Sequence, residues 1–211
     1  GNTYVKVAVF QGDKMLSDES FKKERFQEKI LKILKTHAEV DKIITSSVTK
    51  LSDATKQFLA DLDVKVLKLT HETKVPFQNN YATPETLGVD RIALVVAAVM
   101  QYPKQNVLVI DAGTCITYDF KTHEEIYLGG GISPGIQLRY KTLNLLTANL
   151  PLLTPKMPDS YIGNTTESAI HSGVTVGTIA EIDGIIDRYK EQFAHLTCLL
   201  YTSDAADEED S

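Results

Sequence analysis

A charged pair placed directly before a long apolar run constrains the fold of this chain more than any other feature. Asp90 and Arg91 precede nine consecutive apolar residues, Ile92–Met100. Such a run predicts a helix that is buried nearly all round. Because burying an unpaired charge is costly, Asp90 and Arg91 must each reach solvent, a partner or a ligand.

The chemistry of this pair leaves two interpretations open. Successive side chains on a helix diverge by about 100°, so Asp90 and Arg91 need not pair with each other. A carboxylate at the mouth of a pocket can act as a general base, and a guanidinium can bind a carboxylate or a phosphate through two hydrogen bonds. The alternative is a structural ion pair with other residues of the fold.

The first part of the chain predicts alternating strands and helices. Runs at 4–10 and 14–21 predict a β-hairpin, and the apolar spacing after them predicts an amphipathic helix. A second helix begins after Ser52 and lies between strand-like runs at 42–48 and 64–69. This order predicts an α/β fold with mixed sheets and crossover helices.

The second half of the chain continues the pattern. Thr83 as N-cap and Pro84 in the first turn predict the start of the helix that carries the apolar run. The run 106–110 predicts a central strand, and two more strands and two helices follow it along the chain. A short match between Gly1–Val7 and Gly113–Asp119 leaves internal duplication of the fold open.

The segment Asp111–Thr114 stands where the predicted central strand ends and the chain reverses. Its backbone amides and the Thr114 hydroxyl can donate hydrogen bonds to phosphate oxygens, and Asp111 can hold a cation or its bound water. The alternative is an ordinary hairpin turn in which Asp and Gly only satisfy the turn geometry. Gly1–Thr3 weakly supports a second site of the same kind.

Two groups of glycines indicate further close approaches. The run Gly129–Gly135 predicts a flexible loop that leads into a helix N-terminus, which is either an anion or nucleotide cradle or a plain connector. Gly173 and Gly177 lie four residues apart on the last long helix. They predict close packing of that helix in the core or against a second subunit.

Composition excludes several classes of protein. The formal net charge is −6, but five acids lie in the last eight residues, so the rest of the chain is near neutral and unlike a generic nucleic-acid binder. The chain has neither an apolar run long enough to cross a membrane nor a signal peptide, so we expect a cytoplasmic protein. Its two cysteines and five isolated histidines lack the spacing of a disulfide framework or a structural zinc site.

Taken in chain order, these pieces resemble the motifs of type III pantothenate kinase. The matching segments span residues 1 to about 196, and they are Gly1-Asn2-Thr3, Tyr81-x-x-Pro84-x-x-Leu87-Gly88-x-Asp90-Arg91, Asp111-Ala112-Gly113-Thr114, Gly129-Gly130-Gly131-Ile132-x-Pro134-Gly135 and Gly163-x-x-Thr166. Gly-x-Asp-Arg together with Asp-x-Gly-Thr is the most specific part. The resemblance implies two RNase H-like (actin/hexokinase-like) domains, expected at 1–80 and 81–197, with ATP between them.

The resemblance also implies roles for particular residues. Asp90 matches the proton acceptor that activates the pantothenate hydroxyl, and Asp111 matches a ligand of a monovalent cation, K⁺ or NH₄⁺. The implied contacts of the Mg²⁺-bound ATP are Gly1, Asn2, Thr3, Tyr4, Val5, Lys6 and Thr114. The implied pantothenate contacts are Tyr81, Gly88, Val89, Asp90, Arg91 and Thr166. Within a homodimer, Thr166 would serve the pocket of the partner subunit.

The two ends of the chain depart from the family pattern. The strand before Gly1 and its Asp are missing, so we expect this chain to bind and turn over ATP poorly. Residues 198–211 are expected to be a non-native or disordered acidic tail. The function implied is conversion of pantothenate to 4'-phosphopantothenate in coenzyme A biosynthesis. The alternatives are an accessory transcriptional regulator and another small-molecule kinase of the superfamily; membrane and nucleic-acid partners are not expected.

Overall fold

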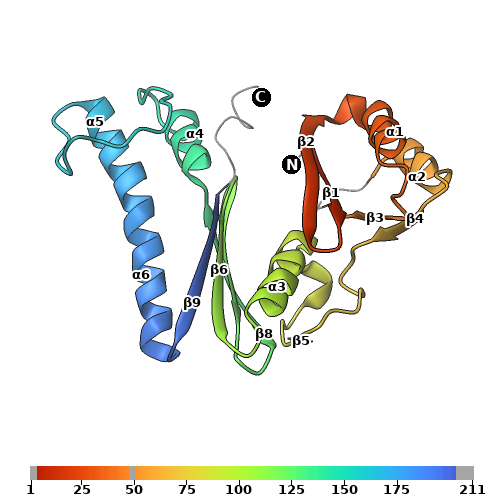
Figure 1. Cartoon of the computed structure of the whole chain (residues 1–211). Coiled ribbons are helices and arrows are strands. Elements are labelled where there is room, and N and C mark those ends of the chain that lie inside the picture. Colours follow the sequence, from red (N-terminus) through yellow and green to blue (C-terminus); the bar gives the residue numbers. More distant parts are fainter. Residues whose placement is uncertain (1–3, 48–50, 203–211) are drawn as a thin grey trace. The chain divides into compact units, whose positions relative to one another are not determined.

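The computed structural model describes residues 4–47 and 51–202 of the 211-residue chain. These residues form two compact units (Figure 1), of which the first holds residues up to Thr73 together with Gly88–Asp90. The second unit holds Lys74–Leu87 and the residues from Arg91 onward. The division therefore falls between Thr73 and Lys74, whereas the sequence places a domain boundary after residue 80.

The first unit contains two pairs of strands and two helices. Its elements are β1 (Tyr4–Gln11), β2 (Lys14–Lys22), a 3₁₀ turn (Lys23–Arg25), α1 (Phe26–Thr36), β3 (Lys42–Thr45), α2 (Asp53–Ala60) and β4 (Lys65–Lys68). Strands β1 and β2 form the predicted antiparallel hairpin, and β3 pairs with β4 in parallel. The backbone N–H of Thr55 donates to Ser52 Oγ at 3.2 Å, which confirms Ser52 as the N-cap of α2.

The second unit is built on one mixed sheet. Its elements are β5 (Gln78–Asn79), a 3₁₀ turn (Pro84–Thr86), α3 (Val89–Gln101), β6 (Asn106–Ala112), β7 (Cys115–Lys121), β8 (Ile126–Pro134), α4 (Ile136–Leu146), α5 (Thr166–His171), a π-helical turn (Ser172–Val176), α6 (Gly177–Gln192) and β9 (Leu196–Thr202). The strand order is β5-β8-β7-β6-β9. The mixed α/β class is therefore confirmed, and β6 is an interior strand of this sheet, paired with β7 and β9, as its apolar run predicts.

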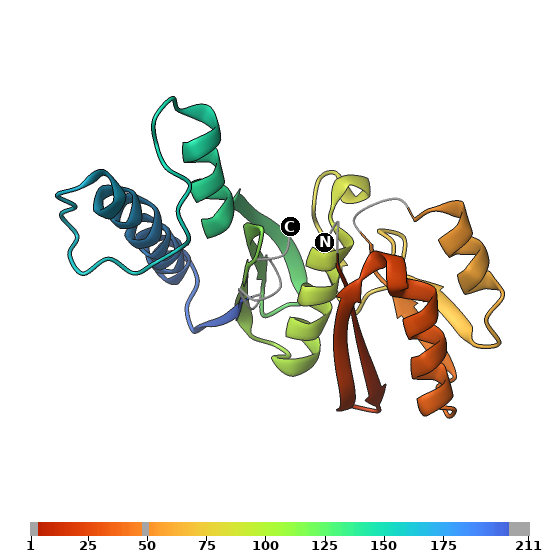
Figure 2. The same ribbon diagram turned by 90° about the horizontal axis from the view of Figure 1, so that it is seen from above.

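Helices cover both faces of this sheet. Figures 1 and 2 show α3 on one side of it and α4 and α6 on the other. Alternate side chains of β6 point to opposite faces, so Val107 and Val109 pack with Ala98 of α3, while Leu108 and Ile110 lie on the face that packs against α6. Among the described residues, no helix has the length and apolar character needed to cross a membrane.

Helix α3 differs from its prediction in where it begins and in how much of its circumference is buried. Thr83 and Pro84 begin only the short 3₁₀ turn, after which Leu87 is extended (ψ 124°), and α3 itself begins at Val89. Ala93 and Met100 are exposed, so the prediction of burial nearly all round is wrong. The buried face of α3 is the one that packs on the sheet.

The glycines 129–131 lie inside strand β8, so the prediction of a flexible loop is wrong there. They pair with β7, with Gly130 opposite Asp119. A Cβ atom at Gly130 would lie 1.7 Å from the backbone oxygen of Tyr118, so the two strand backbones approach more closely than any larger residue allows. This close approach is the reason that glycine is required here. From the sequence alone, such a requirement looks the same as the flexibility of a glycine-rich loop.

Two predictions about the C-terminal part also need correction. Residues 198–202 belong to β9, which pairs in parallel with β6, so a disordered tail from residue 198 is wrong for this segment; residues 203–211 lie outside the described residues. Nothing lies within 4 Å of a Cβ placed at Gly173 or Gly177. The expected close packing in the core is therefore absent among the described residues, and contact with a second subunit stays a prediction.

Candidate active site

The turn between β6 and β7 holds Asp111 and Thr114 beside the start of α4. The N–H of Gly113 donates to the Cys115 oxygen at 3.0 Å, and the N–H of Gly135 donates to the Thr114 oxygen at 3.0 Å. A Cβ at Gly135 would lie 2.1 Å from the Gly113 oxygen, so this contact requires glycine. The start of α4 is thereby fixed against the turn, and a helix begins directly after Gly135, as the sequence predicts.

The donors on this turn suit phosphates and hard cations. Asp111 is half-buried, and Thr114 is exposed. Carboxylate and hydroxyl oxygens are the ligands that Mg²⁺ and other hard cations prefer, and backbone amides at a helix start favour anions. The described residues contain no group of three or more His, Cys, Asp and Glu side chains able to hold a metal ion by themselves. A cation here would therefore need further oxygens, such as those of a bound phosphate.

Asp90 and Arg91 are adjacent in the first turn of α3, but their side chains have different environments. Asp90 is exposed, whereas Arg91 is only 5% exposed. The Arg91 Nε donates to Asp119 Oδ1 at 2.8 Å, and Arg91 Nη2 lies 2.8 Å from the same oxygen. Asp119 belongs to β7 and is fully buried. The structural ion pair, one of the two interpretations of the charged pair, is therefore present at Arg91.

Aromatic side chains surround this ion pair. The Tyr127 hydroxyl donates to Asp119 Oδ1 at 2.6 Å, and the guanidinium carbon of Arg91 lies 5.6 Å from the centre of the Tyr81 ring. The rings of Tyr81 and Tyr127 stack with their centres 6.0 Å apart, and Phe77 meets Tyr127 edge-on. Tyr81 and Arg91, both predicted from the sequence, are thus brought together.

The charges in this cluster are fixed by their surroundings. Burial alone would lower the pKa of Arg91, but the hydrogen bond and the charge of Asp119 outweigh burial and raise the pKa. Burial, followed by the charge and hydrogen bond of Asp119, raises the pKa of Tyr127. Arg91 therefore stays cationic and Tyr127 stays a hydrogen-bond donor over the whole physiological pH range.

Sequence reasoning missed Asp119 and Tyr127. Asp119 stands between the apolar residues Tyr118 and Phe120, inside a predicted strand. A charge at such a position needs a partner, and that is the one signal that could have identified it. Nothing in the sequence pattern distinguishes Tyr127 from an ordinary core aromatic residue.

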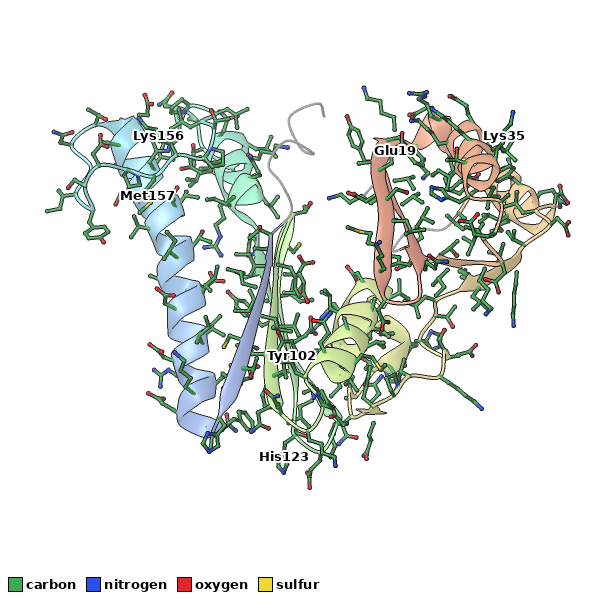
Figure 3. The ribbon with its side chains drawn as sticks, viewed as in Figure 1. Glu19, Lys35, Tyr102, His123, Lys156 and Met157 are labelled. Atoms are coloured by element: carbon green, nitrogen blue, oxygen red, sulfur yellow. The ribbon has the colours of Figure 1, made fainter. Side chains whose placement is uncertain are left out.

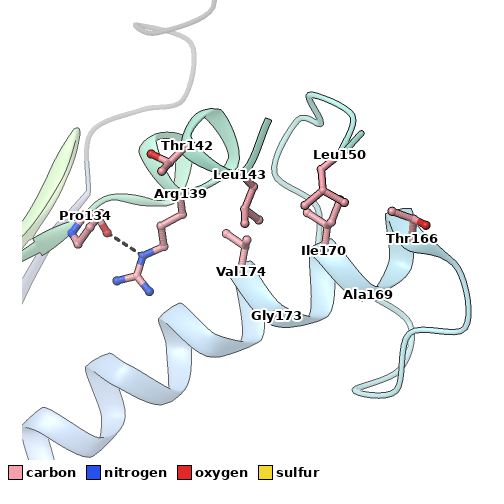
Figure 4. A pocket seen from close by; sticks show the side chains of 10 residues that line it. All are labelled: Pro134, Arg139, Thr142, Leu143, Leu150, Thr166, Ala169, Ile170, Gly173 and Val174. Carbon is pink, nitrogen blue, oxygen red and sulfur yellow. Dashed lines mark hydrogen bonds between the residues drawn. The ribbon is translucent and has the colours of Figure 1, made fainter. Parts of the chain in front are cut away.

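Thr166 lies apart from this cluster, on the other face of the sheet. It is the exposed first residue of α5, and the Thr165 side chain caps that helix by accepting from the Ser168 N–H at 3.1 Å. Thr166 borders a pocket of about 740 Å³ between α4 and the helix formed by α5 and its continuation. Figure 4 shows Leu143 facing Val174 and Leu150 facing Ile170 across it.

A buried hydrogen-bond chain holds α5 against α4. The Thr175 hydroxyl donates to the Lys156 oxygen at 3.0 Å, so it must accept from the Tyr140 hydroxyl, which lies 3.0 Å away. Tyr140 has then used its only proton and accepts from His171 Nδ1 at 2.7 Å. The chain therefore requires a proton on Nδ1 of His171, and it fixes the position of Thr166 five residues earlier.

The remaining predicted residues lie in the first unit or outside the described residues. Tyr4, Val5 and Lys6 form the start of β1 and pair with Lys22, Phe21 and Ser20 of β2. Gly1, Asn2 and Thr3 lie outside the described residues. Gly88 directly precedes α3, and Val89 is its first residue. The structure thus places Tyr81 with Arg91 and Thr114 in the same turn as Asp111, whereas Thr166 lies on the other face of the sheet from Arg91 (Figure 1).

The family model and the curated relatives that match this chain all point to the same family. The family model described as type III pantothenate kinase matches residues 1–188. The chain is 49% identical over 207 residues to the type III pantothenate kinase of Flavobacterium johnsoniae, covering 97% of this chain and 84% of that protein. It is 41% identical over 206 residues to that of Bacteroides fragilis, covering 97% of this chain and 83% of that protein.

A solved structure also shares the fold. It comes from Campylobacter jejuni and carries the name of a Baf family transcriptional activator. The similarity covers 89% of this chain and 84% of that chain, with a TM-score of 0.52 and 22% sequence identity. At this identity the likeness concerns the fold alone. On the family match and the curated relatives, the chain belongs to the type III pantothenate kinase family.

Proposed function

We propose that this protein transfers the γ-phosphoryl group of ATP to the hydroxyl of pantothenate, giving 4'-phosphopantothenate and ADP, the first step of coenzyme A biosynthesis. The observation that carries the proposal is the exposed carboxylate of Asp90 at the start of α3, next to a buried and fixed Arg91, in a chain of this family. Asp90 accepts the hydroxyl proton while the oxygen attacks phosphorus and ADP leaves.

The phosphate-binding residues of the second unit are proposed at the β6–β7 turn. Thr114 and the first amides of α4 are donors for phosphate oxygens, because Gly135 holds that helix start against the turn. Gly1–Lys6 would supply the second phosphate-binding segment, of which Tyr4–Lys6 start β1. Asp111 would hold K⁺ or NH₄⁺, and Mg²⁺ would be bound mainly through the phosphates of ATP. When bound, these cations would supply positive charge beside the transferred group.

The fold itself supports a duplicated RNase H-like architecture. In the second unit the hairpin β7–β8 is followed by α4 and later by the parallel strand β9. In the first unit the hairpin β1–β2 is followed by α1 and the parallel pair β3–β4. The order of hairpin, helix and parallel strand is therefore repeated, which extends the short sequence match between the two halves.

A homodimer would explain the position of Thr166. Within one chain Thr166 lies on the face of the sheet opposite to Arg91, so the two cannot line one pocket of the same subunit. The apolar pocket beside Thr166 and the apolar side chains of Leu145, Leu146, Tyr161 and Ile162, exposed by 74–83%, provide a surface for a second copy. A cytoplasmic location stays a prediction.

The function is tested with protein expressed from its complete coding sequence. With pantothenate, ATP and Mg²⁺ we expect one ADP and one phosphopantothenate per turnover, with faster turnover when K⁺ or NH₄⁺ replaces Na⁺. Phosphorylation of a sugar or of acetate in place of pantothenate would favour another kinase of the superfamily. Retention on DNA without any turnover would favour the regulator.

Modification of Cys115 is expected to block ATP binding. Cys115 is exposed and directly follows Thr114, whereas Cys198 is half-buried and burial raises the pKa of its thiol. We expect iodoacetamide to alkylate Cys115 first and abolish activity, and ATP to slow both effects, as read by mass spectrometry and residual turnover. Cys198→Ser should stay sensitive and Cys115→Ser should resist; a fully alkylated Cys115 with an unchanged KM for ATP would contradict this placement of the nucleotide.

Mixing two inactive variants is expected to restore activity. If each site uses Asp90 of one subunit and Thr166 of the other, a dimer of Asp90→Asn with Thr166→Ala contains one intact site. Random exchange of subunits in such a two-fold dimer should recover about a quarter of wild-type turnover. No recovery after verified subunit exchange would show that both residues act within one subunit or that Thr166 has no role.

A further inference from the structure

We propose that Asp119 and Tyr127 are positioning residues: by holding the guanidinium of Arg91 on β7, they fix the first turn of α3 and so the direction of Asp90. The proposal rests on the proposed function, since it takes Asp90 as the base. In this proposal Arg91 fixes the position of Asp90 and does not bind the pantothenate carboxylate.

The geometry of the helix start supports this assignment. Asp90 and Arg91 are adjacent, so the orientation of one side chain around the helix axis determines that of the other. Arg91 is 5% exposed and shares one oxygen of Asp119 with the hydroxyl of Tyr127, at 2.8 Å and 2.6 Å. Little of the guanidinium surface is left for a ligand, whereas Asp90 is exposed.

The aromatic residues around Arg91 restrict its movement further. Its guanidinium lies over the ring of Tyr81, which stacks on Tyr127. A Cβ at Gly129 of β8 would lie 3.2 Å from the Tyr81 ring, so Tyr81 is closely packed on that side. The hydrogen bond to Asp119 thus sets the direction of the Arg91 guanidinium, and the packed ring of Tyr81 limits its movement. An arrangement of this kind holds a neighbouring group within the narrow range that proton transfer needs.

Stability alone is a poor explanation for the ion pair. Two buried charges lose their hydration, and well-packed apolar residues in their place often leave a protein equally stable. Among the described residues, Asp119 Oδ2 is buried without a hydrogen-bond partner, so this carboxylate is not fully satisfied. A directional contact between a fixed carboxylate and Arg91 fits a positioning role.

The ion pair of Lys121 with Glu125, in which only the lysine is fully buried, provides a control. Lys121 of β7 is fully buried, and its Nζ donates to Glu125 Oε2 at 2.6 Å and to the Tyr102 oxygen at 2.7 Å. Tyr102 follows the far end of α3 and is labelled in Figure 3, with His123 of the β7–β8 turn near the same end of the sheet. We expect that breaking this pair perturbs the Lys121 contact with Tyr102 and leaves the first turn of α3 in place.

The experiment compares Asp119→Asn, Tyr127→Phe and Glu125→Gln with the wild type in protein from the complete coding sequence. We expect Asp119→Asn and Tyr127→Phe to lower kcat by about 10-fold to 10²-fold at unchanged KM for ATP and pantothenate, since a misplaced group lowers the rate without weakening binding. Amide exchange should become faster in residues 87–92 of these two variants only. Glu125→Gln should lose thermal stability and keep its kcat.

Each other outcome contradicts the proposal in a different way. A raised KM for pantothenate at unchanged kcat would show that Arg91 binds the substrate carboxylate. Lower stability with unchanged kcat in Tyr127→Phe, or an equal loss of kcat in Glu125→Gln, would show a purely structural role. If Asp119→Asn does not fold, Tyr127→Phe decides, because it removes one hydroxyl and keeps the ring. A wild-type protein inactive on pantothenate would refute the proposed function instead, while amide exchange would still test the anchoring of α3.

Discussion

Asp90→Asn is expected to lower kcat for pantothenate phosphorylation by about 10²-fold to 10⁴-fold, the contribution of a general base. Asparagine has the shape of aspartate, but its amide does not accept the hydroxyl proton at neutral pH. Because Asp90 is exposed at the first turn of α3, the substitution should leave the melting temperature and the KM for ATP nearly unchanged. Steady-state kinetics with both substrates varied provides the measurement.

Two controls make the result specific to the carboxylate. Asp90→Glu keeps the acid on a longer side chain and should retain more activity than Asp90→Asn. Glu85→Gln removes a charge from the preceding 3₁₀ turn and should behave like the wild type. Full activity in Asp90→Asn would remove Asp90 from the mechanism, and a raised KM for pantothenate with normal kcat would make it a binding residue only.

Gly135→Ala is expected to reduce kcat/KM for ATP by about 10²-fold, the cost of displacing a binding group by roughly 1 Å. A Cβ at this position would lie 2.1 Å from the Gly113 oxygen and 2.6 Å from the Thr114 oxygen. Both are backbone atoms and cannot rotate away, so the start of α4 and the β6–β7 turn must separate. We also expect a loss of about 1–3 kcal/mol in the free energy of unfolding, as for other overpacked sites.

Gly184→Ala is the matched control for the same chemical change. Gly184 lies in the middle of α6, is exposed, and has nothing within 4 Å of an added Cβ. Alanine is the better helix former, so this variant should gain about 0.5–1 kcal/mol of stability and keep its KM for ATP. A Gly135→Ala protein with normal ATP kinetics would show that the contact between α4 and the turn does not serve the nucleotide.

Local sequence signals predicted those elements whose structure depends mainly on residues within the same segment. The alternation in 4–10 and 14–21 predicted the hairpin, and Ser52 predicted the start of α2, because turn geometry and capping act within a few residues. The buried strand β6 followed from its continuous apolar run. The motifs around Asp90 and Asp111 predicted the family, which the match over residues 1–188 confirms.

The same local reasoning failed where a distant partner decides the structure. Gly129–Gly131 have the composition of a loop, yet they form a strand because they pair with β7, whose backbone lies too close to Gly130 for a side chain. Residues 198–202 look like the beginning of a tail, yet they form β9 because the edge of β6 offers unpaired backbone groups. In both cases the pairing strand lies elsewhere in the chain, so the sequence of the segment alone does not indicate it.

The sequence alone predicted candidate residues for the chemistry: an acidic and a basic residue before an apolar helix, and the segment Asp111–Thr114 after a buried strand. The folded chain shows what no local pattern predicts: Arg91 turns inward to Asp119 while Asp90 stays exposed, and Thr166 lies on the opposite face of the sheet (Figure 1). The physical reason is that charge type and spacing are properties of the chain. The partner of a buried charge is set by contacts between segments 28 residues apart, as between Arg91 and Asp119.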